Sequence, residues 1–268
     1  MYRQAYILIS LILCFFSTKL LFSQDTVVNN AFKTGEYLKY RVYYSSSLGN
    51  FTAGEAILTI ENADDSYSGN NNDVYHITGI GNSKGMFNWF YKVRDKFESF
   101  VNKSTLLPYT FIRQTREGKY EQDDIVIFDR EENEAITNSI EVATIPHDVH
   151  DFVSAFYYMR TLDLEDFNSD SMYFINFFLD DSVYVSAVKF KGKSEIDTQW
   201  GTIRCLKIAP MMASGEVFAD KYPMYVWISD DENHIPILVE SEVIVGSVKI
   251  ELMEFGGLAN PVQIGLGD

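Results

Sequence analysis

Apolar and polar residues alternate along most of the chain from Gly35 onward. In the run 51–61, Ala56, Leu58 and Ile60 fall on one face of an extended strand. Similar short runs rich in β-branched and aromatic residues recur at 35–45, 74–81, 94–102, 107–117, 119–129, 134–145, 172–180, 182–192, 202–210, 224–230, 235–244 and 247–255. Polar or glycine-containing segments separate them, as turns separate neighbouring strands. The pattern predicts an all-β domain built from an antiparallel sheet.

One segment, 151–164, follows a helical period instead. Its apolar residues at helical spacing are Phe152, Ala155, Phe156, Met159 and Leu162. Asp151 is a natural N-cap for this helix. We therefore expect a mostly β fold with one main helix, in which a strongly curved antiparallel sheet or open barrel packs on that helix. Phe152, Phe156 and Met159 are expected to face the sheet.

The N-terminal residues carry a different pattern. Arg3 precedes a nearly continuous apolar run that extends to Phe16, and polar residues follow it. A run of about a dozen residues is shorter than the roughly 20 that a membrane-spanning helix needs, so we interpret residues 1–23 as a cleavable signal peptide. The alternatives are an uncleaved anchor, or lipid attachment at Cys14, where the bulky Leu13 does not fit a lipobox. Residues 24–268 then form a single β-rich domain, with a flexible glycine-rich tail from about 256.

Charge and cysteine content narrow the function. The chain has 22 basic and 38 acidic residues, for a net charge of −16, and loss of Arg3 and Lys19 with the signal would leave about −18. Such an acidic surface repels phosphate backbones, which argues against nucleic-acid binding. After cleavage only Cys205 remains, so no internal disulfide is expected.

Two polar clusters resemble metal sites. Residues 230–234 (Asp-Asp-Glu-Asn-His) lie between two apolar runs, and Asp and Asn favour turns there because they bond their own backbone. The second cluster, 147–151 (His-Asp-Val-His-Asp), has two histidines at a spacing that reaches one ion. We interpret the first as a turn and the second as a polar loop that ends in the helix cap, and we expect no metal.

Two further patterns point to hydrolysis. Residues 81–85 match G-x-S-x-G, with Ser83 in the nucleophile position, but no alternating β/α pattern surrounds them. Glu36, Glu55, Asp95 and Glu98 could form carboxylate pairs as in glycosidases, although spacing alone does not place them together. A glycine-bounded turn and solvated strand faces explain these residues better than catalysis does. We therefore expect no catalytic residues.

Several segments resemble one known family. They are 32–60, 89–120, 150–160, 200–210 and 226–252, and their most specific features are Gly35-Glu36 with Tyr40, Ala53-Gly54, the helix at 151–160, and Trp227 with Ser229-Asp230-Asp231 and Pro236. Together they resemble the domain-of-unknown-function 3108 family of exported Gram-negative proteins, over about Phe32 to Leu252. The family has no established activity. The resemblance implies a curved antiparallel sheet closed by helices, similar to the periplasmic lipoprotein carriers LolA and LolB.

These observations favour an exported periplasmic or envelope protein that binds a hydrophobic, acyl or lipid-like ligand without catalysis. A curved sheet has more concave surface than one helix fills, and aromatic segments supply apolar walls. The candidate wall residues are Phe87, Trp89, Phe90, Phe152, Phe156, Met159, Phe174 and Phe177. The alternatives are a structural or protein-interaction component of the envelope, and a hydrolase. No cofactor, nucleic-acid partner or stable membrane span after signal cleavage is expected.

Overall fold

The structure is a computed structural model that describes residues 26–47, 49–64, 73–139, 142–164, 171–210, 224–242 and 247–265. The predicted signal peptide, 1–23, lies outside these residues. The strands are β1 (Tyr37–Ser46), β2 (Gly49–Asn62), β3 (Val74–Ser83), β4 (Arg94–Asn102), β5 (Pro108–Glu117), β6 (Tyr120–Asp129), β7 (Glu134–Thr137), β8 (Ala143–Thr144), β9 (Met172–Leu179), β10 (Ser182–Thr198), β11 (Gly201–Pro210), β12 (Met224–Ser229), β13 (Pro236–Glu242), β14 (Ser247–Gly256) and β15 (Ile264–Gly265). The helices are α3 (Phe87–Phe90) and α4 (Phe152–Met159).

Within the described part of the chain, the strands form one antiparallel sheet of 15 strands. Their order is β8-β7-β6-β5-β4-β3-β2-β1-β14-β13-β12-β11-β10-β9, with β15 beside β11. Most neighbours in the sheet are also neighbours in sequence, as short turns between strands favour. The exceptions are the central pairing of β1 with β14 and the pairing of β15 with β11. The expected all-β, strongly curved antiparallel sheet with one main helix is confirmed.

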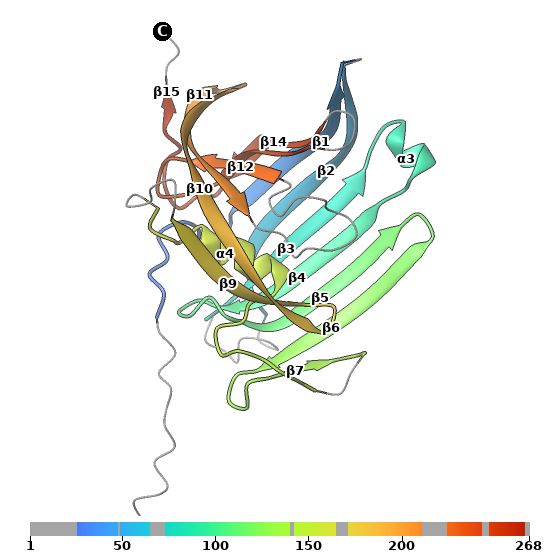
Figure 1. Cartoon of the computed structure of the whole chain (residues 1–268), viewed down its shortest axis with the longest axis vertical. Helices are drawn as coiled ribbons and strands as arrows, with labels where there is room; N and C mark the ends of the chain where they lie inside the picture. Colours follow the sequence, from blue (N-terminus) through green and yellow to red (C-terminus); the bar gives the residue numbers. More distant parts are fainter. Residues whose placement is uncertain are drawn as a thin grey trace, which may run out of the picture.

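The sheet curls so that its two ends approach each other without pairing. Strands β1–β7 form a broad twisted surface, and the β9–β10 hairpin crosses in front of it (Figure 1). Helix α4 lies between this hairpin and strands β3 and β4. No helix within the described residues is long and apolar enough to cross a membrane.

Register aligns the core in rows across the sheet. One row runs Ile60, Ile77, Ser99, Phe111, Val126 and Thr137, from β2 to β7. All of these side chains except Thr137 are buried, because this row lies in the core that α4 completes. The next row runs Leu58, Gly79, Phe97, Arg113 and Asp124. It changes from apolar to charged at β5, so the apolar core ends there.

Helix α4 begins with a capping box. The Asp151 carboxylate accepts hydrogen bonds from the amides of Val153 and Ser154 at 2.7 and 2.8 Å, and Ser154 Oγ accepts from the Asp151 amide at 2.9 Å. These bonds satisfy amides that no intrahelical carbonyl can reach. Ser99 Oγ donates to the same carboxylate, which ties the start of the helix to β4.

The face that α4 buries differs from the expected one. Val153, Ser154 and Tyr157 are buried, whereas Phe152 is 51% exposed. Phe156 and Met159 are half-buried at the borders of the core. Phe152 therefore borders the sheet, with its ring centroid 6.0 Å from that of Phe97 on β4, without being buried by it. The helix buries Val153 and Tyr157 because its cap at Asp151 and the residue after it, Arg160, are both buried and held by partners in the interior.

The glycine-rich tail contacts the domain over its described part. Asn260 donates to the Asn30 carbonyl at 2.8 Å and exchanges hydrogen bonds with Asn233. Leu258 and Val262 pack against the core cluster around Trp227. Strand β15 pairs with β11. The flexibility expected from about 256 stays a prediction, now for a segment with these contacts.

Candidate functional site: a pocket closed by the β9–β10 hairpin

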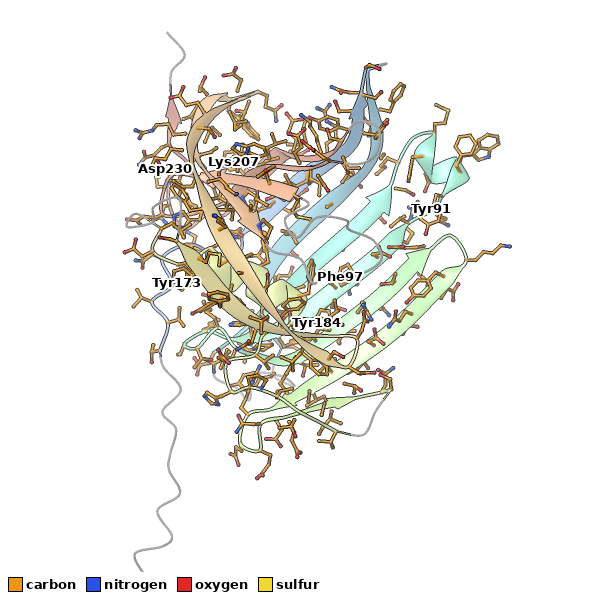
Figure 2. All side chains as sticks on the ribbon, viewed as in Figure 1. Tyr91, Phe97, Tyr173, Tyr184, Lys207 and Asp230 are labelled. Atoms are coloured by element: carbon orange, nitrogen blue, oxygen red, sulfur yellow. The ribbon has the colours of Figure 1, made fainter. Side chains whose placement is uncertain are left out.

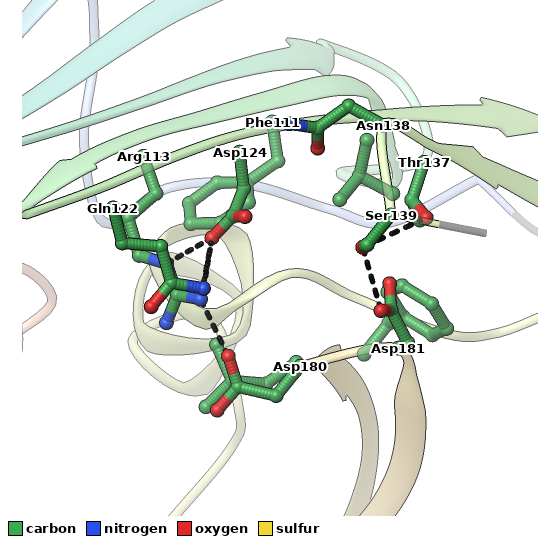
Figure 3. A pocket seen from close by; sticks show the side chains of 12 residues that line it. Phe111, Arg113, Gln122, Asp124, Thr137, Asn138, Ser139, Asp180 and Asp181 are labelled. Carbon is green, nitrogen blue, oxygen red and sulfur yellow. Dashed lines mark hydrogen bonds and ion pairs between the residues drawn. The ribbon is translucent and has the colours of Figure 1, made fainter.

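A pocket lies where the β9–β10 hairpin meets the inner face of β5, β6 and β7 (Figure 3). Its volume is about 170 Å³. Apolar side chains from the core row and from β9 form one part of the lining: Phe111, Val126, Phe178 and Leu179. Polar side chains form the rest: Arg113, Gln122, Asp124, Thr137, Asn138, Ser139, Asp180 and Asp181. The pocket therefore has an apolar floor and a polar rim.

The hairpin turn has a conformation that its two aspartates tolerate. Asp180 and Asp181 have φ angles of 47° and 56°, and Leu179 pairs directly with Ser182. A two-residue turn with both φ angles positive matches the right-handed twist of the flanking strands. This turn positions both carboxylates at the rim of the pocket.

Two contacts hold the hairpin turn against the sheet, and we call this pair of contacts the latch. Arg113 Nη2 donates to Asp180 Oδ1 at 2.5 Å, and Ser139 Oγ donates to Asp181 Oδ2 at 2.6 Å. Arg113 Nε also donates to Asp124 Oδ2 at 2.6 Å. Because two carboxylates surround this guanidinium, it is not available to a ligand anion while the latch is closed. Asp180 is 56% exposed, so water competes for its contact with Arg113, and opening the latch costs little free energy.

Beside the pocket, the inner face carries aromatic side chains that the helix only partly covers. Phe97 on β4 is half-buried and pairs across the strand with Arg113. Its ring centroid lies 6.0 Å from that of Phe152 on α4. Phe97, Phe156 and Val183 all pack at the border of the cluster that contains Phe111, Val126 and Phe178. An apolar surface therefore continues from the pocket floor to the exposed start of α4.

The eight candidate wall residues do not line one cavity among the described residues. Phe87, Trp89 and Phe90 lie on α3, which Figure 1 shows at the end of the β3–β4 hairpin, away from α4. Phe174 is 61% exposed on β9, and Phe177 stacks on Tyr184, with ring centroids 5.5 Å apart. Only Phe152 and Phe156 border the surface beside the pocket. The aromatic strand and hairpin segments were grouped by composition, and composition does not reveal which face of a hairpin they occupy.

A buried ion pair lies deeper, beyond the end of α4. Arg160 donates to both carboxylate oxygens of Glu36, at 2.6 and 2.8 Å, and to the carbonyls of Asn233 and Ala31. Its guanidinium also lies 5.1 Å from the centroid of the Tyr157 ring. The two charges neutralise each other, so the pair joins the N-terminal segment, the helix and the β12–β13 turn rather than offering a reactive group.

Residues 230–234 form the turn between β12 and β13, as expected. Asp231 Oδ1 accepts from Ser229 Oγ at 2.8 Å and from the Asn233 amide at 3.0 Å. His234 has a φ of 44°, and its Nδ1 lies 2.8 Å from the Arg160 carbonyl oxygen. The turn also makes tertiary contacts, because it forms one wall of the Arg160 site.

The second histidine cluster directs its side chains to separate partners. Asp148 accepts hydrogen bonds from Asn176, Asp151 caps α4, and His147 Nδ1 lies 3.3 Å from Asn133. His150 is buried against the Tyr158 ring, and burial lowers the pKa of its imidazole to about 3. Within the described residues no three His, Cys, Asp or Glu side chains gather as a metal site would require.

The residues considered for hydrolysis are also dispersed. Ser83 Oγ donates to Asn88 Oδ1 at 2.8 Å and accepts from the Val93 amide at 2.9 Å, so it stabilises the turn that contains α3. The carboxylates of Glu36, Glu55 and Glu98 pair with Arg160, Lys84 and His76, respectively. Asp95 accepts from the Arg116 amide. Each of these groups has a structural partner of its own.

The pocket residues were not expected to form a site. Arg113 and Asp124 occupy inward positions of β5 and β6, where an alternating pattern predicts apolar side chains. A charged residue at an inward position of a strand can be recognised from the sequence, and it indicates a polar site on the inner face. Its partner at Asp180 lies 67 residues away in the chain, and no local pattern connects the two.

Comparison with solved structures supports the fold. A β-barrel-like protein of the domain-of-unknown-function 1849 from Brucella abortus matches with a TM-score of 0.53 and 10% identity, covering 87% of this chain and 98% of that one. A candidate lipoprotein from Parabacteroides distasonis matches with a TM-score of 0.36 and 10% identity, covering 87% of this chain and all of that one. A candidate exported protein with a YmcC-like fold from Bacteroides fragilis has a TM-score of 0.34 and 9% identity, with the same coverage.

Comparison with families gives a more specific result. No curated protein matches the chain. The model of the DUF3108 family, described as proteins of unknown function, matches residues 39–253. This range includes the pocket, the latch, α4 and most of the central β1–β14 pairing. The chain belongs to the DUF3108 family.

Proposed function

We propose that this chain is an exported envelope protein that binds an apolar or amphipathic ligand on the concave face of its sheet, without catalysis. The observation that carries the proposal is the continuous apolar surface formed by Phe97, Phe152 and Phe156 beside the pocket floor at Phe111 and Phe178. Surfaces with an apolar floor and a few polar groups at the rim are typical of ligand sites.

The size of the pocket defines how a ligand binds. A volume of about 170 Å³ is below the roughly 300–1,000 Å³ of typical small-molecule sites. A long acyl chain therefore lies along Phe97 and Phe152 with one end in the pocket, or it enters after the latch has opened. The polar rim favours a ligand with a polar end, and Arg113 can meet an anionic end once the latch has opened.

We include export to the periplasm in this proposal. The apolar run that ends at Phe16, with Arg3 before it and polar residues after it, is typical of a signal peptide. Cleavage near Ser23 would release the domain into the periplasm. Mass spectrometry of the protein from its native host tests this: we expect a mature N-terminus near Gln24, and an intact N-terminus or a lipid on Cys14 would contradict it.

Displacement of a fluorescent fatty acid from delipidated protein tests ligand binding. We expect saturable binding by the wild type, and an affinity about tenfold lower for Phe97→Ser because an apolar contact is lost. Ile127→Ser is the matched control, since Ile127 is 49% exposed on β6 and faces away from Val126, which lines the pocket. Native mass spectrometry of the same samples detects a co-purifying lipid. Absence of saturable binding by the wild type would reject the proposal.

A second function, interaction with another envelope protein, is favoured by one observation. Ile125, Ile127 and Ile136 are 48%, 49% and 41% exposed on neighbouring strands β6 and β7. Ile127 and Ile136 are directly opposite each other in the register. Contiguous exposed apolar residues at a sheet edge are typical of protein contacts. Cross-linking in native cells distinguishes this function, because Ile127→Ser should then remove a specific cross-linked partner while fatty-acid binding is absent.

A further inference from the structure

The segment 84–94 between β3 and β4 exposes an unusual concentration of apolar surface, and we call this segment the aromatic tip. Met86, Phe87, Trp89, Phe90 and Tyr91 are 68%, 47%, 82%, 73% and 43% exposed. The rings of Trp89 and Phe90 contact each other, with centroids 5.1 Å apart. A large exposed apolar patch on a soluble domain marks a contact surface rather than a packing accident.

The aromatic tip is held in a defined conformation. Ser83 Oγ donates to Asn88 Oδ1 at 2.8 Å, the Asn88 amide donates to the Lys84 carbonyl, and the Tyr91 amide donates to the Phe87 carbonyl. The Lys84 amide donates to the Ala53 carbonyl of β2 at 2.8 Å. On the other side, the Gly118 amide donates to the Lys92 carbonyl. The aromatic side chains are therefore presented on a braced turn and lose little freedom on binding.

The charge of the aromatic tip is opposite to that of the whole chain. Residues 84–94 contain Lys84, Lys92 and Arg94 and no acidic residue, in a protein of net charge −16. All three cationic residues are exposed. The neighbouring β5–β6 turn adds the exposed Lys119 and Tyr120, and the β1–β2 hairpin adds Phe51, which is 48% exposed. Aromatic side chains surrounded by cations are the combination that a phospholipid interface selects.

The aromatic tip lies at one end of the molecule, so a membrane can contact it without covering the ligand site. Figure 2 shows Tyr91 on one side of the molecule and Lys207 and Asp230 on the other. Figure 1 shows α3 at the free end of the β3–β4 hairpin, beyond the α4 region. A flat surface that touches α3 therefore does not need to displace the β9–β10 hairpin.

We propose that the aromatic tip docks the domain onto a phospholipid membrane by shallow insertion of Met86, Phe87, Trp89 and Phe90 into the headgroup region, with Lys92 and Arg94 against lipid phosphates, while Lys84 stays paired with Glu55. Insertion of a few aromatic side chains gives reversible, peripheral binding. The docking is independent of the ligand site, because the tip shares no residue with the pocket.

Vesicle sedimentation tests the proposal, with phosphatidylcholine vesicles that contain one quarter phosphatidylglycerol. The protein is recovered from the exporting host, so that wild type and variants carry the same N-terminus. We expect wild-type binding, about tenfold weaker binding by Trp89→Ser, and a further loss in the Trp89→Ser/Phe90→Ser double variant. Lys92→Gln should weaken binding about fivefold through the lost attraction to anionic lipid. Val185→Ser, which removes a side chain that is 53% exposed on β10, should bind as the wild type does.

Tryptophan fluorescence gives an independent readout. Trp227 is 9% exposed, and Trp200 packs beside Phe255 in the core cluster around Trp227, so Trp89 is the tryptophan that a bilayer can reach. We expect a blue shift of the emission on vesicle binding, and quenching by lipids brominated along their acyl chains. Neither change should occur in Trp89→Ser.

Three results would overturn the proposal. The first is a wild type that neither sediments with vesicles nor shifts its emission. The second is a Val185→Ser variant that loses binding as fully as Trp89→Ser, since the tip would then not be specific. The third is a concentration-dependent dimer that Trp89→Ser abolishes while vesicles are not bound, which would assign the tip to a second copy of this chain. Unchanged fatty-acid displacement in Trp89→Ser keeps this test separate from that of the ligand site.

Discussion

Glu36 and Arg160 stand 124 residues apart in the sequence and form a fully buried, bidentate ion pair. Glu36 precedes β1 and Arg160 follows α4. Through the Asn233 carbonyl, the same guanidinium reaches the β12–β13 turn. Taking two charges out of water is costly, and only their mutual contact and the added carbonyl bonds offset that cost. The pair therefore depends on both partners.

Removal of one partner should be strongly destabilising. Glu36→Gln leaves the Arg160 guanidinium buried without a counter-charge, and we expect a loss of about 3–5 kcal/mol in the free energy of unfolding. Urea denaturation followed by circular dichroism measures it. Lys39→Gln, which breaks the exposed pair with Glu254, serves as the control and should leave the midpoint unchanged. Equal stability of Glu36→Gln and the wild type would show that the pair is not formed.

Two neighbouring residues should respond to pH in opposite directions. Burial lowers the pKa of His150 to about 3, whereas the same imidazole titrates near pH 6.5 in the unfolded chain. Below about pH 6.5 the unfolded chain therefore binds a proton that the folded chain does not bind, and the free energy of unfolding decreases as the pH falls. Burial raises the pKa of Asp151 to about 6, so as the pH falls the folded chain binds a proton at this carboxyl before the unfolded chain does. The stabilisation that this proton provides is fully present below about pH 4 and is lost as the pH rises through about 6.

Single variants separate these two effects. Between pH 7 and 5, His150→Gln should gain stability relative to the wild type, and Asp151→Asn should lose stability relative to it. Urea midpoints at several pH values provide the measurement. If both variants show the same pH slope as the wild type, these two groups do not titrate differently in the folded and unfolded chains.

At the scale of elements, α4 shows how two helical stripes compete. Phe152 and Phe156 are one pair at i and i+4, and Val153 and Tyr157 are another, and both pairs suit a buried face. The second pair is the one that faces the core, because Asp151 and Arg160 anchor the two ends of the helix. The anchors come from β4 and from the segment before β1, which lie far away in sequence.

The buried stripe predicts the cost of truncation. Tyr157 is 1% exposed, and Tyr157→Ala should cost about 3–5 kcal/mol, as removal of a large buried aromatic side chain does. Phe152→Ala, at a half-exposed position, should cost about 1 kcal/mol or less. Thermal unfolding of the two variants measures the difference. A larger loss for Phe152→Ala than for Tyr157→Ala would show that the helix packs on its other face.

The sequence predicts the elements better than their contacts. The two-residue period locates the strands because alternate side chains of each strand meet the same core, and the Asp151 cap locates the start of α4. Helix α3 has only four residues and shows no full helical period, so the sequence does not indicate that its aromatic side chains lie on an exposed turn rather than on a cavity wall. The pocket depends on Arg113 meeting Asp180, and this contact arises from the curl of the sheet rather than from any local pattern.

At the scale of the whole molecule, the sheet has a strong centre and weak ends. Strands β1 and β2 pair along ten positions, whereas β8 has two residues and β9 is bordered by β10 and a single bridge between His150 and Phe177. Short strands at an edge lose their hydrogen bonds more easily than central strands. Local opening should therefore begin at the two ends that meet at the latch.

Hydrogen exchange tests this gradient. We expect amides in β1 and β14 to exchange last, and amides in β7, β8 and the tip of the β9–β10 hairpin to exchange first. Arg113→Gln should increase exchange at the hairpin tip while leaving β1 unchanged, since it removes one contact of the latch. Mass spectrometry of peptides after timed labelling gives the comparison. Equal protection in β1 and at the hairpin tip would contradict a latch that opens locally.

The pairing of β1 with β14 has a consequence for when the protein can fold. Strand β1 begins at Tyr37 and its partner β14 ends at Gly256, so the centre of the sheet cannot form until nearly the whole polypeptide has been released. Contacts that join distant parts of a chain form slowly. For the exported protein that we propose, this strand order delays completion of the sheet until the residues of β14 have crossed the membrane.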